Sequence, residues 1–225
     1  MKEFSFITTC GGQYSMDYAN KSNSMLKRNC RIPFDSYCIT ERPEELTKDI
    51  KPIKPERNVK GWWNKVLSFS SKMPEGWILV MDIDLIIIND LTEVIQYGIE
   101  ANAQMAAYSD AIHWMDCKFS SSFMLFRSGA LEPIFKNFME NYDILENRPG
   151  GDQVWIEPQL QNILYLDEKF PNLKRSLKFD LASSLENDKI SLPMQISSEI
   201  KIIDFHGNPK PHQLLNWPIV KENWY

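Results

Sequence analysis

The sequence WILVMDIDLIII, residues 77–88, is the longest apolar run in this 225-residue chain, and only two aspartates interrupt it. A run that is apolar on both faces is typical of a central strand in a parallel sheet. Predicted strands and helices alternate along the rest of the chain. This alternation favours an α/β fold with a mostly parallel central sheet and helices on both faces. We expect one domain that spans residues 1–225.

The other elements follow from hydrophobic periodicity and from turn residues such as Gly and Pro. Further strands are expected at residues 4–9, 36–40, 104–108, 121–127 and 200–205. Helices are expected at residues 17–29, 62–71, 91–98, 130–145 and 152–164. The polar segment 41–58, which contains prolines, predicts an irregular connection.

Two carboxylates, Asp82 and Asp84, lie at the end of the predicted central strand. Side chains alternate along a strand, so both are expected to point to one side while Ile83 points away. In open α/β sheets, ligands bind beyond the carboxyl ends of the strands. Two adjacent carboxylates repel each other unless a cation neutralises them, and hard oxygen ligands suit Mg²⁺ or Mn²⁺. The pair therefore predicts a metal ion that grips a diphosphate, although aspartates also commonly cap turns.

The segment FHGNPKPH, residues 205–212, places a histidine and a lysine on a glycine- and proline-rich turn. A neutral imidazole at His206 can complete a metal site that carboxylates begin, and Lys210 can offer a positive charge to phosphate. A lone histidine is more often structural, but two of the chain's three histidines flank this lysine. His212 could equally be a surface residue.

Composition excludes several classes of protein. The formal net charge of −5 argues against a broad nucleic-acid surface, which needs an excess of Lys and Arg on one face. No signal peptide is recognisable, and no uncharged apolar stretch is long enough to span a membrane. The four cysteines form no C-x-x-C pair and no zinc-type spacing, which indicates free thiols in a reducing compartment. We expect a cytoplasmic protein without a membrane span.

Taken together, these segments resemble the GT-A-fold glycosyltransferases, nearest to the retaining family 8 enzymes of the glycogenin and galactosyltransferase type. Residues 119–126, FSSSFMLF, resemble the family's F-N-(S/A)-G-V-x-L-(F/I) segment, and residues 151–153 resemble its D-Q segment. Residues 206–212 resemble its H-x-x-G-x-x-K-P-W pattern. The chain departs from that pattern because His206 and Lys210 are closer in sequence, His212 replaces the tryptophan, and Ser120 replaces the usual asparagine.

The resemblance implies transfer of a sugar from a nucleoside diphosphate donor, most often UDP, to a hydroxyl group of a glycan or another acceptor, with retention of configuration. Mn²⁺ or Mg²⁺ is the implied cofactor. The implied site comprises Thr8, Thr9, Cys10 and Tyr14 for the nucleoside; Asp82, Asp84 and His206 for the metal; Lys65, Asp82, Gly207 and Lys210 for the diphosphate; Ser120 beside the donor sugar; and Asp152 and Gln153 on its reacting face. If the reaction inverts configuration instead, Asp152 becomes the candidate general base.

Two other functions remain open from the sequence. A D-x-D after an apolar strand also marks aspartyl-phosphate hydrolases, although those carry it on their first strand. The second alternative is a protein that binds a sugar nucleotide without turning it over, and the shortened His–Lys spacing favours this alternative. Weaker candidates for sugar contacts are Asp110, Trp62, Trp63, Trp114 and Trp155.

Overall fold

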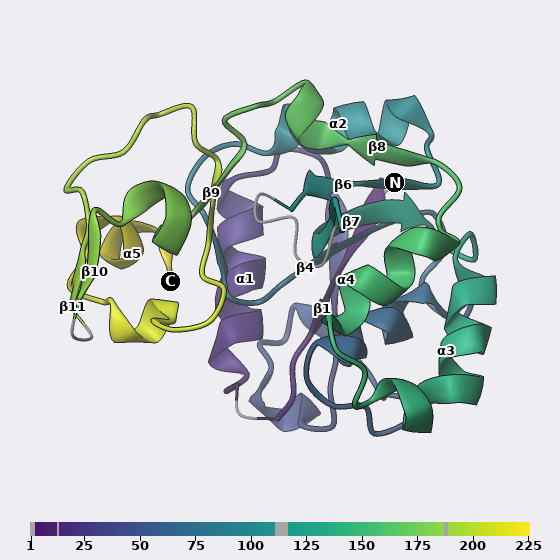
Figure 1. Cartoon of the computed structure of the whole chain (residues 1–225). Helices are drawn as coiled ribbons and strands as arrows, with labels where there is room; N and C mark the ends of the chain where they lie inside the picture. The colour runs from purple at the N-terminus through teal and green to yellow at the C-terminus, as the bar shows by residue number, and fades with distance from the viewer. Residues whose placement is uncertain (1–2, 13, 111–116, 187–188) are drawn as a thin grey trace.

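The computed structural model describes residues 3–12, 14–110, 117–186 and 189–225, and its central layer is a seven-stranded sheet (Figure 1). The strand order is β3-β2-β1-β4-β7-β6-β8. Strand β7 runs antiparallel to both of its neighbours, whereas the other four strand pairs are parallel. The predicted α/β fold with a mostly parallel central sheet is therefore confirmed. The strands are Phe4–Thr9 (β1), Phe34–Ile39 (β2), Ile50–Ile53 (β3), Trp77–Met81 (β4), Met105–Ser109 (β6), Phe119–Arg127 (β7) and Ile163–Tyr165 (β8).

Helices cover both faces of this sheet. Alternate residues of a strand point to opposite faces, so buried strands supply apolar side chains to a core on each side. Along β4, Leu79 and Met81 join one hydrophobic core, and Ile78 and Val80 join the other. Figure 1 shows helix α1 on one side of the sheet and helices α3 and α4 on the other. The first core includes residues of α1 (Asp17–Arg28), α2 (Thr92–Ala101) and α5 (Pro218–Asn223); the second includes residues of the 3-10 helix η2 (Gly61–Phe69), α3 (Glu132–Leu145) and α4 (Gly151–Ile156).

The predicted single strand over residues 77–88 is wrong, because the chain changes sheets at the two aspartates. Strand β4 ends at Met81, and the Leu85 amide donates to the Asp82 carbonyl at 3.3 Å, which closes a turn. Strand β5, Leu85–Ile87, then joins a second sheet of order β5-β12-β9. In that sheet β12, Ile202–Asp204, pairs with β5 on one side and with β9, Lys174–Ser176, on the other. This change of sheet brings the C-terminal segment beside the end of β4.

Two other predicted elements differ in the structure. The connection 41–58 contains strand β3, which extends the parallel edge of the sheet. The helix expected over 152–164 ends at Ile156; a short 3-10 turn that contains Pro158 follows, and then strand β8. The remaining elements are Pro43–Glu45 (η1), Glu157–Gln159 (η4), Leu166–Glu168 (η5), the π-helical turn Leu177–Leu181 (η6), the hairpin strands Ser184–Glu186 (β10) and Lys189–Ser191 (β11), and Pro211–Gln213 (η7).

All four cysteines are free and buried, as the sequence predicted. Burial raises the pKa of the thiols of Cys10 and Cys117 to about 12 and that of Cys38 to about 11. Burial also raises the pKa of Cys30. Among the described residues, no helix combines the length and apolar character needed to cross a bilayer.

We predict that the folded protein resists thiol reagents near pH 8. The reactive species is the thiolate, and both burial and the raised pKa values suppress it. Labelling with a chromogenic disulfide should be slow in native buffer and should reach all four thiols in denaturant. Rapid native labelling of even one cysteine, located by peptide mapping, would contradict this packing.

Candidate functional site

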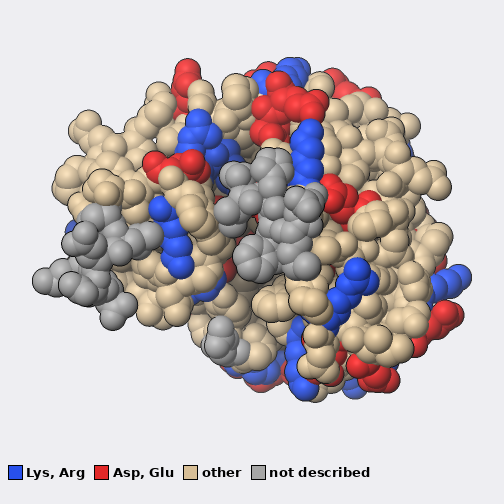
Figure 2. Space-filling model, in the orientation of Figure 1, with Lys and Arg blue, Asp and Glu red and all other residues tan. Residues whose placement is uncertain are grey.

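A cavity of about 940 Å³ lies beyond the carboxyl ends of β1 and β4. Its walls come from the segments that follow β1 and β4, from η2 and β7, from the first turn of α4, and from the chain after β12. On the face drawn in Figure 2, acidic and basic side chains are interspersed rather than segregated. The residues that line the cavity include Thr9, Tyr14, Trp62, Lys65, Asp82, Asp84, Asp110, Ser120, Asp152, Gln153, Lys174, Asp204, His206, Gly207 and Lys210.

A buried lysine holds two of the cavity's carboxylates together. Lys65 Nζ lies 3.0 Å from Asp82 Oδ1 and 3.2 Å from Asp152 Oδ2, and it donates to Ser121 Oγ at 2.7 Å. The side chains of Lys65 and Asp152 are each only 7% exposed. Burial would lower the pKa of Lys65, but the charges of Asp152 and Asp82 outweigh it and raise that pKa. For Asp82, burial raises the pKa to about 6, against the opposing charge of Lys65.

The second aspartate has a lysine of its own. Lys210 forms an ion pair with Asp84 Oδ2 and also donates to the Phe205 carbonyl at 2.9 Å. Tyr14 donates its hydroxyl to the same Asp84 oxygen at 3.2 Å. Asp82 and Asp84 therefore line one cavity, but they do so from a turn rather than from a strand, and each is held by a different lysine.

His206 also lines this cavity, next to Asp204. Its Nδ1 lies 3.8 Å from Asp204 Oδ1, and its ring stacks on Phe179 with centroids 5.0 Å apart. Burial would raise the pKa of Asp204, but the hydrogen bond from His206 and the charge of Lys174 lower it to about 2. The Nε2 atom of His206 is buried and has no hydrogen-bond partner. A buried polar atom without a partner is unusual and points to a missing ligand.

The predicted metal ligands match a divalent cation in chemistry. Carboxylate oxygens from Asp82 and Asp84 and the unpartnered Nε2 of His206 are donor atoms that Mn²⁺ and Mg²⁺ accept. In the described part of the chain, however, no three His, Cys, Asp or Glu side chains are gathered closely enough to hold an ion. Lysine ion pairs occupy both aspartates instead.

The other predicted site residues divide into two groups. Thr9, Tyr14, Ser120, Gly207 and the pair Asp152–Gln153 line the cavity. Thr8 and Cys10 do not line it, because both side chains are buried within the fold. The Thr8 hydroxyl donates to the Tyr37 carbonyl at 3.4 Å, and Cys10 Sγ donates to the Ser15 carbonyl at the same distance.

The weaker candidates also separate. Trp62 lines the cavity and is 58% exposed, whereas Trp63 and Trp155 belong to the core. Asp110 accepts a hydrogen bond of 2.7 Å from Gln153 Nε2. His212 lies outside the cavity, where it bonds to the Tyr18 hydroxyl. The remaining candidate, Trp114, lies outside the described residues.

Sequence reasoning missed two lysines that lie beside the predicted residues, Lys174 and Lys178. Lys174 Nζ lies 3.3 Å from Asp204 Oδ2 and 3.4 Å from Ser120 Oγ. Lys178 Nζ packs against Gly207 so closely that an added Cβ there would lie 2.8 Å from it. Lys178 forms no hydrogen bond or ion pair with the rest of the described chain. No local pattern marks these residues, because the pairing of β9 with β12 brings Lys174 to the cavity wall and Lys178 beside Gly207.

No protein-family model and no curated protein sequence matches this chain. Solved structures do match it. An active-site mutant of LgtC shares 11% identity at a TM-score of 0.64, over 97% of this chain and 94% of its own. The galactosyltransferase LgtC in complex with donor and acceptor sugar analogs shares 12% sequence identity at a TM-score of 0.61. The match covers 97% of this chain and 93% of LgtC. The glycosyltransferase GlyE of Streptococcus pneumoniae TIGR4 shares 16% sequence identity at a TM-score of 0.59. The match covers 99% of this chain and 63% of GlyE. The predicted resemblance to GT-A glycosyltransferases is thereby confirmed at the level of the fold.

We predict that Lys65→Met destabilises the fold by ~3–5 kcal/mol at neutral pH, because it leaves the buried carboxylate of Asp152 and the partly exposed one of Asp82 without a counter-charge. The folded pKa of Asp82 already lies above its ordinary 3.8, so the native state binds this proton more tightly than the unfolded chain does. Stability from this group therefore falls as pH rises from about 4 to about 6. Losing the lysine strengthens that trend.

The defect of Lys65→Met should accordingly be larger at pH 8 than at pH 5, as measured by urea unfolding. The control is Lys60→Met, which removes the exposed ion pair with Glu146 and should leave the unfolding midpoint unchanged. An equal loss of stability at both pH values would show that Lys65 acts through packing alone.

Proposed function

We propose that this protein is a glycosyltransferase that moves a sugar from a nucleoside diphosphate donor, with UDP as the nucleotide, to a hydroxyl group of a glycan or another acceptor. The observation that carries the proposal is the single cavity in which Asp82, Asp84, Lys65, Lys210 and Asp152 meet. The cavity lies beyond the carboxyl ends of parallel strands, where α/β folds bind ligands. The likeness to solved glycosyltransferases supports the same reaction class.

The nucleoside half of the donor fits the end of the cavity next to β1. Thr9, Gly11 and Gly12 line the cavity there, and the backbone of these glycines leaves room for close approach. The half-buried ring of Tyr14 offers a flat face for the base. Its hydroxyl remains tied to Asp84, so the nucleoside end and the metal end of the site are linked by one side chain.

The diphosphate would lie between the two aspartates and the turn after β12. Asp82, Asp84 and His206 are the residues that would hold Mn²⁺ or Mg²⁺, which would neutralise charge on the departing diphosphate. Lys210 and Lys178 add positive charge from the same side of the cavity. The reducing compartment that four free thiols favour leads us to propose a cytoplasmic location.

Asp152 and Gln153 support a positioning role at the donor sugar. Gly150 and Gly151 both adopt positive φ, at 88° and 69°, and this backbone turns the first residues of α4 into the cavity. Asp152 is paired with Lys65 Nζ at 3.2 Å, and this ion pair occupies one of its carboxylate oxygens. This pairing favours the retaining course over one that needs Asp152 as a general base. Orientation and electrostatic stabilisation then supply most of the catalysis.

We predict that Asp84→Asn abolishes Mn²⁺-dependent turnover of the UDP-sugar donor while the far-UV circular dichroism stays unchanged. In the unmodified protein, UDP with Mn²⁺ should raise the melting temperature more than UDP alone, because the ligand binds only the native state. Asp17→Asn, at the exposed pair with Lys21, is the matched control. Undiminished turnover in Asp84→Asn would remove the metal role from this residue.

The same assays separate the two alternatives. Hydrolysis of a simple aryl phosphate without any nucleotide would identify a phosphohydrolase. Tight UDP binding with neither transfer nor donor hydrolysis, over a panel of sugar donors, would identify a binding protein. The anomeric configuration of the product, read by NMR, decides between retention and inversion.

We predict that Lys178→Ala weakens UDP binding by about tenfold, which corresponds to ~1.4 kcal/mol. The free ammonium group beside Gly207 is the reason, since it has no partner to lose within the described chain. Titration calorimetry at low and high salt should show the deficit shrinking as salt screens the charge. Lys136→Ala, at an exposed pair on α3, is the control. Equal UDP affinity in the two variants would exclude Lys178 from the site.

A further inference from the structure

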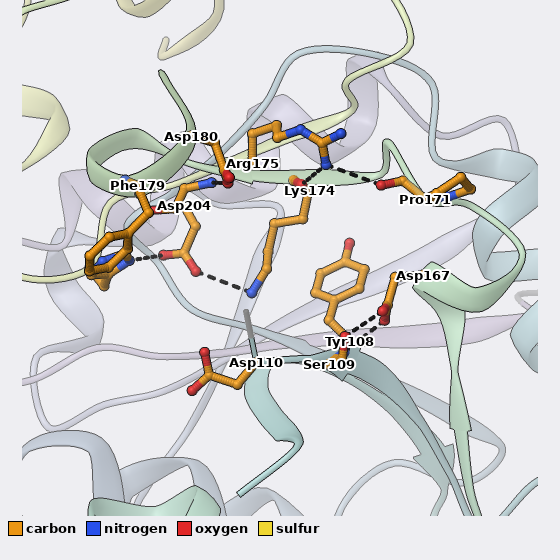
Figure 3. A pocket seen from close by; sticks show the side chains of 12 residues that line it. Tyr108, Ser109, Asp110, Asp167, Pro171, Lys174, Arg175, Phe179, Asp180 and Asp204 are labelled. Atoms are coloured by element: carbon orange, nitrogen blue, oxygen red, sulfur yellow. Dashed lines mark hydrogen bonds and ion pairs between the residues drawn. The ribbon is translucent and has the colours of Figure 1, made fainter. Parts of the chain in front are cut away.

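A second, smaller cavity of about 200 Å³ opens beside the main one (Figure 3). The two cavities share four wall residues: Asp110, Lys174, Asp204 and His206. None of the functions assigned so far uses the rest of this smaller cavity. Its size allows for one sugar ring or a few water molecules, but not for a nucleotide.

Tyr108 provides the first sign that the small cavity has an occupant. Its side chain is 1% exposed, and its hydroxyl has no hydrogen-bond partner. The pairing of β6 with β7 shifts register between Ala107 and Tyr108, and bulges of this kind re-aim side chains near functional sites. In Figure 3 the hydroxyl points away from β6, toward the segment that carries Lys174 and Arg175.

His206 provides the second sign. Its ring stacks at 15° on that of Phe179 and so holds the phenyl ring beside the small cavity. Phe179 lines this polar cavity and is 60% exposed, so part of its ring is open to a ligand. An aromatic side chain of this kind can pack against the apolar C–H groups of a sugar ring.

The charged groups of this cavity already have partners within the protein. Asp167 accepts from the Ser109 amide at 2.7 Å, and Asp204 is held by Lys174 and His206. Arg175 donates to the Pro171 carbonyl at 3.1 Å and to the Lys174 carbonyl at 2.9 Å, so its guanidinium group also has partners. An anionic ligand would face the carboxylates of Asp110, Asp167, Asp180 and Asp204. The groups left without partners are neutral hydrogen-bonding atoms and an aromatic face.

We propose that the small cavity is the acceptor subsite and that it takes an uncharged terminal sugar. The proposal rests on the proposed glycosyltransferase function. Hydroxyl groups of the sugar would satisfy Tyr108 Oη, and the ring would pack against Phe179. The shared wall at Asp110 places the acceptor next to the donor sugar's end of the main cavity, where Gln153 also lies.

The transfer step balances without another reactant. The acceptor hydroxyl oxygen forms a bond to the anomeric carbon of the donor sugar. The bond from that carbon to the diphosphate oxygen breaks, its electron pair stays on the diphosphate, and the hydroxyl proton ends on the released diphosphate or in solvent. No oxidant or reductant is consumed.

Tyr108→Phe and Phe179→Ala test the subsite. Each should raise the KM for a neutral sugar acceptor by about tenfold, or ~1.4 kcal/mol, while the KM for the UDP-sugar donor stays constant. Tyr108→Phe should melt at the same temperature as the unmodified protein or higher, since the hydroxyl has no hydrogen bond to lose. Leu215→Ala, at a leucine that is 51% exposed and outside both cavities, is the control.

The outcomes distinguish the acceptor-subsite proposal from the glycosyltransferase proposal on which it rests. Donor hydrolysis in the unmodified protein, followed without any acceptor, tests the glycosyltransferase function by itself. If that activity is present and both variants keep the control's acceptor KM, the small cavity holds only water and the subsite is excluded. A larger effect with acidic acceptors than with neutral ones would also overturn it. Saturation-transfer NMR with methyl glycosides and UDP should detect binding that Phe179→Ala loses.

Discussion

The site depends on one buried ion-pair arrangement, in which Lys65 joins Asp82 to Asp152. These residues come from three separate elements: the 3-10 helix η2, the turn after β4, and the first turn of α4. A buried ammonium group is tolerated only when its charge is compensated, and buried carboxylates have the same requirement. The three side chains therefore fix one another, and the cavity wall between η2 and α4 follows from their mutual dependence.

A second constraint is the departure of the chain from the sheet at Asp82. Because β4 ends at Met81, the two aspartates occupy a turn and can face different lysines within one cavity. The chain then returns as β5 and pairs with β12, which places the turn after Asp204 opposite Asp84. The same pairing explains how a shortened His–Lys segment still brings Lys210 to Asp84.

Much of the fold and part of the site could be predicted from local sequence patterns. The apolar run before Asp82 correctly indicated a central strand, and the helix expected from residue 152 begins as α4 at Gly151. The apolar run continued through residues 85–88, however, and no local signal showed that these residues change sheets, because β5 is as apolar as β4. Lys174, Lys178 and Tyr108 escaped notice for a related reason. Their roles arise from long-range strand pairing and from a register shift, and neither leaves a short pattern in the sequence.

To bind a diphosphate, this cavity needs more positive charge than the two lysines beside its aspartates supply. Asp82, Asp84 and Asp152 carry three negative charges against the two positive charges of Lys65 and Lys210, so the group has a net charge of −1 when all are ionised. A doubly charged diphosphate would be repelled by that group in a site of low dielectric constant. Lys178 alone would bring the group to neutrality, and a divalent cation at the aspartates would make it positive. Burial is the main cause of the raised pKa of Asp82, and the negative charges of Asp84 and Asp152 raise that pKa further. The excess negative charge of this group destabilises the fold when no ligand is bound. The same charge would attract a cation into the cavity, and the cation would then attract a phosphate ester.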